Sequence, residues 1–232
     1  MKKVWVAAMM ALVVAGGVQA KEWKSVRIGI EGSYPPFSRT EANGDVTGFD
    51  VDMVKALCVE MKVECTIVKQ DWDGMIPGLK AKKFDGVISS MTVTPAREKV
   101  IDFSSELFSG PTAYVSKKGS GITADVASLK GKTVGYEQGT IQEAYAKAVL
   151  DKAGVTTKAY ANQDQVYADL TSGRLDASVQ DMLQAELGFL KSPNGADYEI
   201  SKPVDSELLP AKTAVGIKKG NTELKALLDK GI

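Results

Sequence analysis

Short runs of aliphatic and β-branched residues alternate with helical patterns along this 232-residue chain, and this alternation restricts the possible folds more than any other feature. The expected strands cover residues 26–30, 65–68, 86–89, 113–116, 133–136, 157–160, 177–180 and 214–217. The expected helices cover residues 49–57, 75–81, 142–152, 163–172, 181–190 and 222–229. Strands that alternate with helices are typical of α/β proteins with mostly parallel sheets. The sequence therefore predicts an α/β fold.

A loose internal repeat indicates two lobes of similar construction. Residues 79–90 resemble residues 170–181, and each segment holds a helix end, an apolar–Asp pair, a short strand and a polar residue. Ligands of open α/β sheets bind outside the carboxyl ends of the strands. Ser89, Ser90 and Asp181 occupy those ends, at least one residue in each lobe. The repeat therefore predicts a cleft between two lobes.

The N-terminus has the pattern of a secretory signal peptide. Lys2 and Lys3 precede the apolar run 4–14, and small residues lead to Ala20. The alternative is a membrane anchor, but the apolar run is shorter than the ~18 residues that a spanning helix needs. We therefore expect residues 1–20 to be a signal peptide that is cleaved after Ala20, and the mature protein to be exported.

Export affects the interpretation of the two cysteines. Cys58 and Cys65 are seven positions apart. In an oxidising compartment such a pair favours a disulfide that joins the end of a helix to the next strand. Two buried free thiols are the alternative.

Composition excludes several classes of function. The chain has no histidine, so a Ser-His-Asp triad, a Cys-His dyad and a His-ligated metal site are impossible. Lys plus Arg and Asp plus Glu number 29 each, so the net charge does not favour a nucleic-acid partner. We expect no metal and no cofactor.

Two segments have the chemistry of an anion site. Thr94 can cap a helix that has Pro95 at its first position, which places Arg97 on the first turn. An arginine near hydroxyl and backbone N–H groups can bind a carboxylate. Residues 135–142 run from a strand through a glycine turn to a helix N-terminus, which also favours an anion. The alternative for Arg97 is an ordinary solvated surface charge.

Acidic and aromatic residues supply the complementary cation site. Asp181 and Glu31 each follow a predicted strand, and either can accept hydrogen bonds from an ammonium or guanidinium group. Tyr34 and Trp72 lie in turn segments, where their rings can pack against an aliphatic stem or a cation. The structural alternatives are a helix cap for Asp181 and simple packing for Tyr34 and Trp72.

The chain resembles the periplasmic substrate-binding proteins of polar amino-acid ABC transporters (solute-binding protein family 3), and is most similar to the lysine/arginine/ornithine- and histidine-binding group. The resemblance covers nearly all of residues 21–229. Its motifs in this sequence are Tyr34-Pro-Pro-Phe37, Gly48-Phe49-Asp50-Val-Asp52, residues 70–77, residues 85–94 with Arg97, Asp102-Phe103-Ser104, Gly139-Thr140, residues 159–162, residues 173–177 and Asp181.

The resemblance implies a type II periplasmic-binding-protein fold. Each lobe would be a mostly parallel sheet flanked by helices, with the ligand cleft between the lobes. Lobe 1 would be discontinuous, comprising residues 21–109 and 207–232, and lobe 2 would comprise residues 110–206. Cys58–Cys65 would be the disulfide found in the basic-amino-acid group.

The resemblance also implies a role for each site residue. Arg97 would bind the ligand α-carboxylate with help from Ser90 and Thr92, and Asp181 would bind the α-ammonium group together with Ser90. Tyr34 and Trp72 would stack on the stem of the ligand side chain. Ser89 and Glu31 would contact its distal cationic group.

The chain departs from the family pattern at several places. Glu31 is longer than the aspartate expected in the basic-amino-acid binders, and Ile141 replaces a threonine that helps to bind the carboxylate. Glu137 stands where an apolar residue is common and adds a second acid near the cation. The chain ends at Ile232, where relatives continue for another helix or two, so we expect either a truncated chain or a differently completed lobe 1.

These observations predict a non-enzymatic periplasmic receptor. We expect it to be a monomer that binds arginine, lysine or ornithine, with histidine as a further option, and delivers the ligand transiently to an inner-membrane ABC permease. Two alternatives use the same fold: a cyclohexadienyl- or arogenate-dehydratase-like enzyme with Glu137 as its acid, and a binder of another polar amino acid or an opine.

Overall fold

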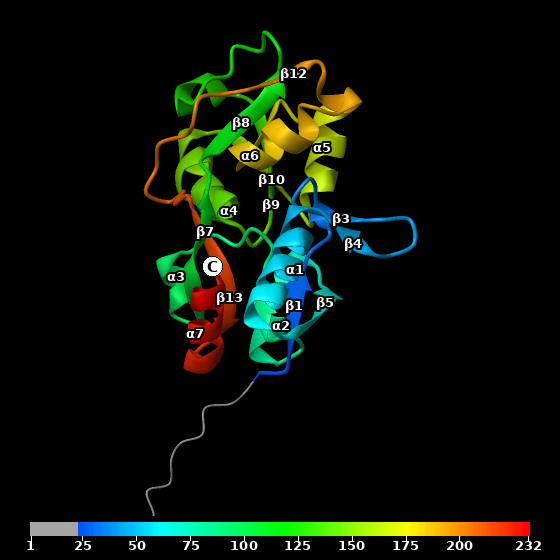
Figure 1. Cartoon of the computed structure of the whole chain (residues 1–232). Helices are drawn as coiled ribbons and strands as arrows, with labels where there is room; N and C mark the ends of the chain where they lie inside the picture. The colour runs from blue at the N-terminus through cyan, green and yellow to red at the C-terminus, as the bar shows by residue number, and fades with distance from the viewer. Residues whose placement is uncertain (1–22) are drawn as a thin grey trace, which may run out of the picture.

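The computed structural model describes residues 23–232, which form two α/β lobes, one above the other in Figure 1. This confirms the predicted fold class. The expected signal peptide and its cleavage site lie outside the described residues. Within residues 23–232, no helix is long and apolar enough to cross a membrane.

The first lobe contains a five-stranded sheet in the order β5-β1-β6-β13-β7 within the described part of the chain. Its strands are β1 (Ser25–Ile30), β5 (Glu64–Lys69), β6 (Gly86–Val87), β7 (Ile101–Ser109) and β13 (Lys212–Lys218). The strand β1 pairs in parallel with β5 and β6, whereas β13 is antiparallel to both β6 and β7. A small sheet beside it comprises β2 (Ser33–Tyr34), β3 (Ser38–Thr40) and β4 (Val46–Thr47).

The second lobe has a sheet in the order β10-β9-β11-β8-β12. Its strands are β8 (Thr112–Lys117), β9 (Thr133–Glu137), β10 (Thr156–Tyr160), β11 (Ala177–Asp181) and β12 (Tyr198–Ile200). The pairing repeats that of the first lobe: β9 is parallel to β10 and β11, and β8 is antiparallel to β11 and β12. The two sheets therefore have equivalent topologies.

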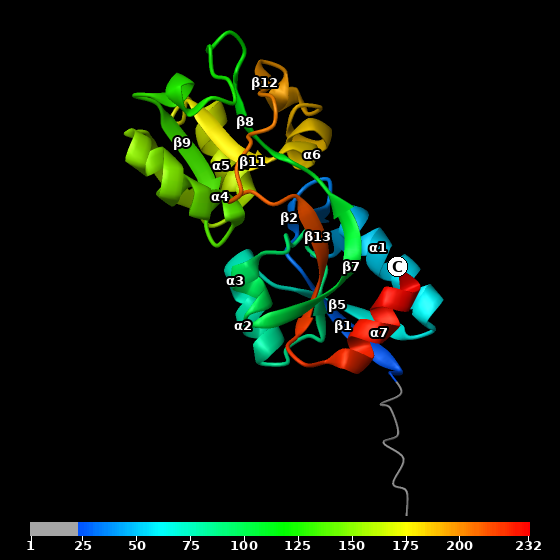
Figure 2. The ribbon, with the colours of Figure 1, turned by 90° about the vertical axis from the view of Figure 1, so that its left-hand side faces the viewer.

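One strand in each sheet, β13 in the first lobe and β8 in the second, is antiparallel to the others, and the path of the chain explains why. The chain passes from β7 in the first lobe to β8 in the second, and returns from β12 to β13 (Figure 2). A strand that enters a lobe from its neighbour begins at the edge facing that neighbour. The strands β8 and β13 therefore run away from the cleft, and the carboxyl ends of the parallel strands point toward it. The lobe boundaries at residues 109/110 and 206/207 stay a prediction.

The repeated sequence pattern has the same structural role in both lobes. Phe84 and Leu175 each pack over a glycine of the adjacent strand, where an added Cβ would lie 2.9 Å from the Phe84 ring at Gly29 and 2.4 Å from Leu175 at Gly135. The aspartate that follows each of them binds a backbone N–H of that strand, Asp85 that of Arg27 at 3.0 Å and Asp176 that of Thr133 at 2.8 Å. The repeated pattern therefore positions β6 and β11 against their neighbours.

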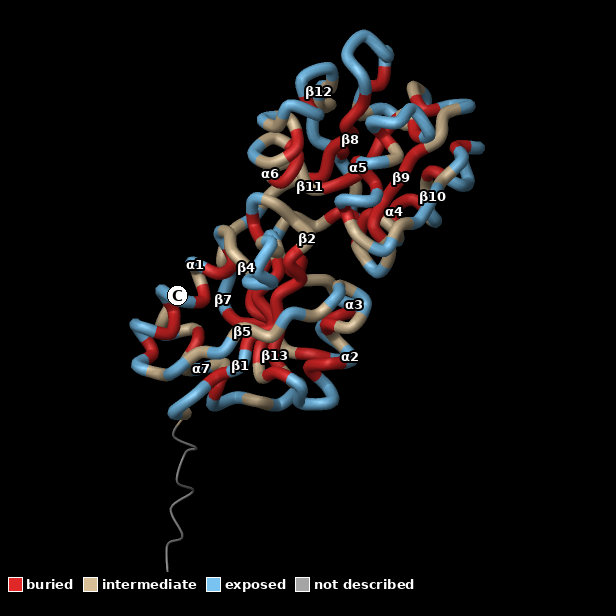
Figure 3. The backbone as a smooth tube through the Cα atoms, turned by 90° about the vertical axis from the view of Figure 1, so that its right-hand side faces the viewer, coloured by how far each residue is buried: buried red, intermediate tan, exposed pale blue. Residues whose placement is uncertain are grey.

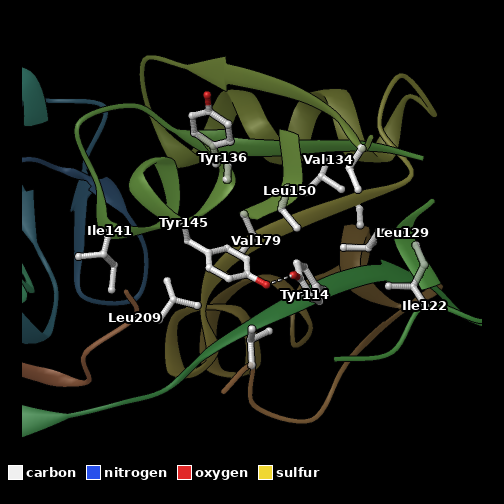
Figure 4. Packing of buried hydrophobic residues seen from close by; sticks show 14 residues of the cluster. Tyr114, Ile122, Leu129, Val134, Tyr136, Ile141, Tyr145, Leu150, Val179 and Leu209 are labelled. Atoms are coloured by element: carbon white, nitrogen blue, oxygen red, sulfur yellow. Dashed lines mark hydrogen bonds between the residues drawn. The ribbon is translucent and has the colours of Figure 1, made fainter. Parts of the chain in front are cut away.

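Helices cover both faces of each sheet, and the buried parts of the backbone concentrate on the strands between them (Figure 3). In the first lobe, α1 (Phe49–Met61) and α7 (Thr222–Gly231) pack on one face through residues such as Val54 and Leu224, and α2 (Met75–Lys80) packs on the other through Leu79. In the second lobe, Leu150 lies in a cluster in which the Tyr114 and Tyr145 hydroxyls are hydrogen-bonded at 2.9 Å (Figure 4).

The helical segments agree with the predicted ones except in detail. The α-helices are α1 (Phe49–Met61), α2 (Met75–Lys80), α3 (Pro95–Glu98), α4 (Ile141–Tyr145), α5 (Gln163–Thr171), α6 (Met182–Gln184) and α7 (Thr222–Gly231). Short 3-10 turns are η1 (Trp72–Gly74), η2 (Val126–Leu129), η4 (Asp151–Ala153) and η6 (Pro193–Gly195), and η3 (Ala146–Leu150) and η5 (Ala185–Phe189) are π-helical. The expected helices 142–152 and 181–190 are thus each built from an α-helical start and a π-helical continuation.

Two further findings concern the first lobe. Cys58 in α1 and Cys65 in β5 form a disulfide, as predicted, with their Cα atoms 6.1 Å apart. The strand β7 was not predicted, because its apolar–polar alternation is interrupted by Ser104, Ser105 and Glu106. Its pairing with β13 has matching register irregularities.

Candidate functional site

The site is built at the carboxyl ends of equivalent strands. Glu31 directly follows β1 and Ser89 lies two residues after β6, whereas Glu137 and Asp181 are the last residues of β9 and β11. The two lobes therefore present polar side chains toward each other, as expected for ligand sites of open α/β sheets.

All ten residues expected at the site line one cavity between the lobes. They are Glu31, Tyr34, Trp72, Ser89, Ser90, Thr92, Arg97, Glu137, Ile141 and Asp181. Five further residues line the cavity and were not named among the expected site residues, namely Thr140, Gln142, Gln163, Val179 and Gln180, although Thr140 and Gln142 lie in the segment 135–142 that was expected to favour an anion. Thr140, Gln142 and Gln180 are sequence neighbours of predicted residues, so adjacency to a strand end or helix start was the available signal.

Arg97 is a buried cation at the cavity wall. Thr94 caps α3 as predicted, since its hydroxyl oxygen accepts the Arg97 backbone N–H at 3.1 Å. The guanidinium donates to the carbonyl oxygens of Thr92 at 2.8 Å and of Gly139, in the other lobe, at 3.2 Å. Burial lowers the pKa of Arg97 to about 10, and the negative charge of Asp181 opposes this shift. Arg97 is therefore charged at neutral pH and is 9% exposed, so it is not a solvated surface charge.

The ring of Trp72 lies against this cation. The Arg97 Cζ atom is 5.2 Å from the centroid of the Trp72 ring, which is within cation–π distance. The aromatic face therefore helps to fix the guanidinium as well as lining the cavity.

Asp181 is held by hydrogen bonds from both lobes. Its Oδ2 accepts the Tyr34 hydroxyl at 2.6 Å, and its Oδ1 accepts Gln142 Nε2 at 2.7 Å. Burial raises the pKa of Asp181, and these two hydrogen bonds oppose the shift. Asp181 precedes α6 but its carboxylate makes no capping hydrogen bond, so it is not the helix cap that the alternative interpretation required.

The serines after β6 are positioned by a buried acid and by the strand end. Ser90 has a φ of 49°, a conformation that non-glycine residues seldom adopt, and its hydroxyl donates to Asp50 Oδ2 at 3.4 Å. Burial raises the pKa of Asp50 to about 7. The Ser89 hydroxyl oxygen accepts the backbone N–H of Glu31 at 3.2 Å.

The second lobe contributes the start of α4. Thr140 caps this helix by accepting the Glu143 N–H at 3.2 Å, and its own hydroxyl donates to the Glu137 carbonyl at 2.6 Å. Ile141 is buried and supplies an apolar part of the cavity wall.

Glu31 and Glu137 face each other across the cleft. Each is 4% exposed, and their carboxyl groups are in hydrogen-bonding contact. Among the described residues no donor reaches the buried Oε1 atom of either side chain. Burial raises the pKa of both groups, and the charge of Glu31 raises that of Glu137 further. This end of the cavity is therefore acidic and lacks a cation partner in the described structure.

Direct contacts hold the lobes together around the cavity. Besides the Tyr34–Asp181 bond, Gln184 Nε2 donates to the Pro35 carbonyl at 2.7 Å. At Gly188 an added Cβ would lie 2.4 Å from that carbonyl oxygen, so the close approach requires glycine. These contacts describe a closed arrangement of the two lobes.

The described side chains do not group into a recognisable metal site. Within residues 23–232, no cluster of three or more Cys, Asp or Glu side chains has the arrangement of a metal site.

Comparison with known proteins places this geometry in context. Residues 26–232 match the family model described as bacterial extracellular solute-binding proteins, family 3. The lysine/arginine/ornithine-binding periplasmic protein of Escherichia coli K12 is 43% identical over 226 residues, which cover 97% of this chain and 87% of that protein.

Two solved structures of ancestral proteins are similar throughout. An ancestral arginine-binding protein bound to arginine has a TM-score of 0.83 and 35% identity, with 91% of this chain and 92% of that chain covered. An ancestral amino-acid-binding protein described as a precursor of cyclohexadienyl dehydratase has a TM-score of 0.79 and 31% identity, covering 90% and 88% of the two chains.

Proposed function

Because the chain belongs to the bacterial extracellular solute-binding proteins of family 3, we propose that it is the periplasmic receptor of an ABC importer and captures a cationic L-amino acid by closure of its two lobes. Arginine, lysine and ornithine are the proposed ligands, with histidine as a further option. The closed form would deliver the ligand transiently to an inner-membrane permease.

The observation that supports this proposal is the distribution of charge in the cavity. Arg97 and Asp181 are suited to the α-carboxylate and α-ammonium groups of an amino acid, because each is ionisable and lines the cavity. Glu31 and Glu137 supply two acids elsewhere in the same cavity. A buried charge without a partner costs several kcal/mol. A ligand that carries a carboxylate, an ammonium group and a distal cation gives Arg97, Asp181 and the two glutamates partners of opposite charge.

Arg97 and Asp181 also take part in contacts between the two lobes. Tyr34 and Asp181 come from different lobes and meet at 2.6 Å, and Arg97 reaches Gly139 across the cleft at 3.2 Å. A ligand that contacts both lobes favours the closed state by the difference between its affinities for the closed and open states.

A thermal-shift panel of the twenty amino acids with ornithine, citrulline and octopine tests this function. Stabilisation follows the ratio of ligand concentration to the dissociation constant. We expect the largest increases in melting temperature with arginine, lysine or ornithine. A shift with glutamate and none with arginine would overturn the proposal, and a largest shift with octopine would reassign the ligand to the opines.

Dehydratase activity is a second candidate, because one similar structure is described as a precursor of cyclohexadienyl dehydratase. Burial favours the protonated form of Glu137, which would be the general acid. Incubation with arogenate tests this candidate. We expect no aromatic product, and formation of one that depends on Glu137 would establish the enzyme instead of the receptor.

A further inference from the structure

Glu31 and Glu137 form a carboxyl pair with unusual surroundings, and the proposed function alone does not explain it. The two side chains come from the ends of β1 and β9, which occupy equivalent positions in the two sheets. Both are 96% removed from solvent, since each is 4% exposed, and both line the cavity. No donor among the described residues reaches either Oε1 atom. Each residue thus lines the cavity and keeps one buried oxygen atom that no donor of the described residues reaches.

The charged groups around the carboxyl pair are mostly acidic. Asp164, Asp71 and Asp50 act on Glu31, and Asp181 and Asp73 act on Glu137, and each raises the pKa of its neighbour by repulsion. The buried cation Arg97 is engaged with the carbonyl groups of Thr92 and Gly139. Two carboxylates in contact cannot both be ionised at low cost in a buried site. The empty pair is therefore stable only when it holds a proton.

We propose that the carboxyl pair retains one proton while the cleft is empty and releases it to solvent when a guanidinium group enters between the two side chains. This inference rests on the proposed function and specifies its ligand and its linkage to pH. The balance is simple: a neutral carboxyl, a carboxylate and a guanidinium become two carboxylates and a guanidinium, and one proton passes to the buffer. The O–H bond of the neutral carboxyl group is the only covalent bond that breaks.

A guanidinium group suits this exchange because of its geometry and its permanent charge. It offers five N–H donors in a plane, so it can donate to two carboxylates at once, and it does not lose its own proton in proteins. The orphaned Oε1 atoms of Glu31 and Glu137 would both gain donors. The second acid therefore selects a permanently charged side chain over a neutral one of the same shape.

Citrulline is the matched control ligand. It has the same α-ammonium and α-carboxylate groups as arginine and a side chain of nearly the same shape, but its distal group is neutral. Any proton that Asp181 releases on contact with the α-ammonium group is released with both ligands. The difference in proton release between arginine and citrulline therefore isolates the carboxyl pair.

Isothermal titration calorimetry at pH 8 in two buffers of different ionisation enthalpy measures this difference. We expect arginine to release about one proton more than citrulline. The affinity for arginine should rise about tenfold per pH unit relative to that for citrulline between pH 7.5 and 8.5. Equal proton release with the two ligands would overturn the inference and leave the receptor function intact, whereas no arginine binding would overturn both.

Substitution of each acid provides an independent test. In Glu137→Gln and in Glu31→Gln, the extra proton released with arginine should disappear, because no shared proton remains. Each variant should bind arginine about tenfold or more weakly and bind citrulline with a much smaller change. An extra proton that persists in both folded variants would contradict the inference. If neither variant folds, the comparison of ligands with the unaltered protein decides the question.

Discussion

Asp181 and the carboxyl pair line the same cavity, yet their carboxyl groups are supported differently. Asp181 accepts hydrogen bonds from Tyr34 and Gln142, whereas Glu31 and Glu137 each have an Oε1 atom that no donor of the described residues reaches. Burial raises the pKa in all three cases. Protein donors stabilise the charged form of Asp181, but the carboxyl pair depends on a proton or on a ligand.

This difference indicates that Asp181 and the carboxyl pair recognise different parts of the ligand. A group that has protein partners before the ligand arrives is preorganised, so it costs little to use and suits a feature common to all amino acids. A group left without partners discriminates more strongly, because a ligand that fails to supply the missing donors leaves it unsatisfied. We therefore expect Asp181 to determine whether an amino acid binds, and the carboxyl pair to determine which one binds.

The largest expected effect comes from Asp181→Asn. The substitution removes the charge that faces the ligand α-ammonium group, and losing one partner of a buried charge pair costs about 3 kcal/mol, or a factor of about 100 in affinity. The unfolding temperature of the empty protein should change little, because asparagine keeps an acceptor for Tyr34 and the cost of a buried charge disappears. Calorimetry with arginine and citrulline should show equal losses.

The exposed Asp197, placed in the loop before β12, provides the control. Asp197→Asn should leave both affinities unchanged. If Asp181→Asn still bound arginine normally, Asp181 would have only a structural role, and the division between the two groups would be wrong.

A smaller effect is expected on the pH dependence of the free energy of unfolding, to which Glu31 and Glu137 both contribute. Burial raises the pKa of Glu31 from its ordinary value of 4.5 to about 7, and it also raises the pKa of Glu137. The folded state then binds more protons than the unfolded state in this interval, so the free energy of unfolding falls as the pH rises from 4.5 toward 7. We expect Glu137→Gln to reduce this fall by about 1–2 kcal/mol.

Urea unfolding of the empty protein at pH 5 and pH 7.5 measures this effect. Asp50 also has a raised pKa and contributes in the same direction, but it is present in both proteins and cancels from the comparison. Identical pH dependence in the two proteins would mean that the carboxyl pair is already relieved of its charge repulsion without a ligand.

The sequence was sufficient to predict the strand ends and the residues placed there. Glu31, Ser89 and Asp181 could be identified because a polar residue next to a buried strand is a local pattern. The repeat at Phe84 and Leu175 was visible because the same packing over a strand glycine recurs in both lobes. These parts of the fold and the site depend on neighbours in sequence, so one chain is enough to reveal them.

Contacts between distant segments could not be predicted in the same way. The Tyr34 hydroxyl reaches Asp181 across 147 positions, and Gln142 reaches it across 39. Glu137 was expected near the ligand cation, but only the fold shows that it touches Glu31 and that both lack donors. Such contacts depend on how two separately folded lobes close, and no local pattern records that.

The smallest expected effect concerns the capping residue behind Arg97. Thr94 accepts the Arg97 N–H at 3.1 Å and so fixes the start of α3, a helix of only four residues. Loss of an N-cap costs about 1 kcal/mol, and part of this cost should appear as weaker binding, up to about fivefold, because Arg97 is less well positioned. Thr94→Ala should weaken arginine and citrulline equally, since both present the same α-carboxylate to Arg97. Thr156→Ala, at an exposed position in β10, is the matched control and should change neither affinity. A loss confined to arginine would mean that Arg97 is linked to the distal cation, and that preorganised and selective groups are not separate in this cleft.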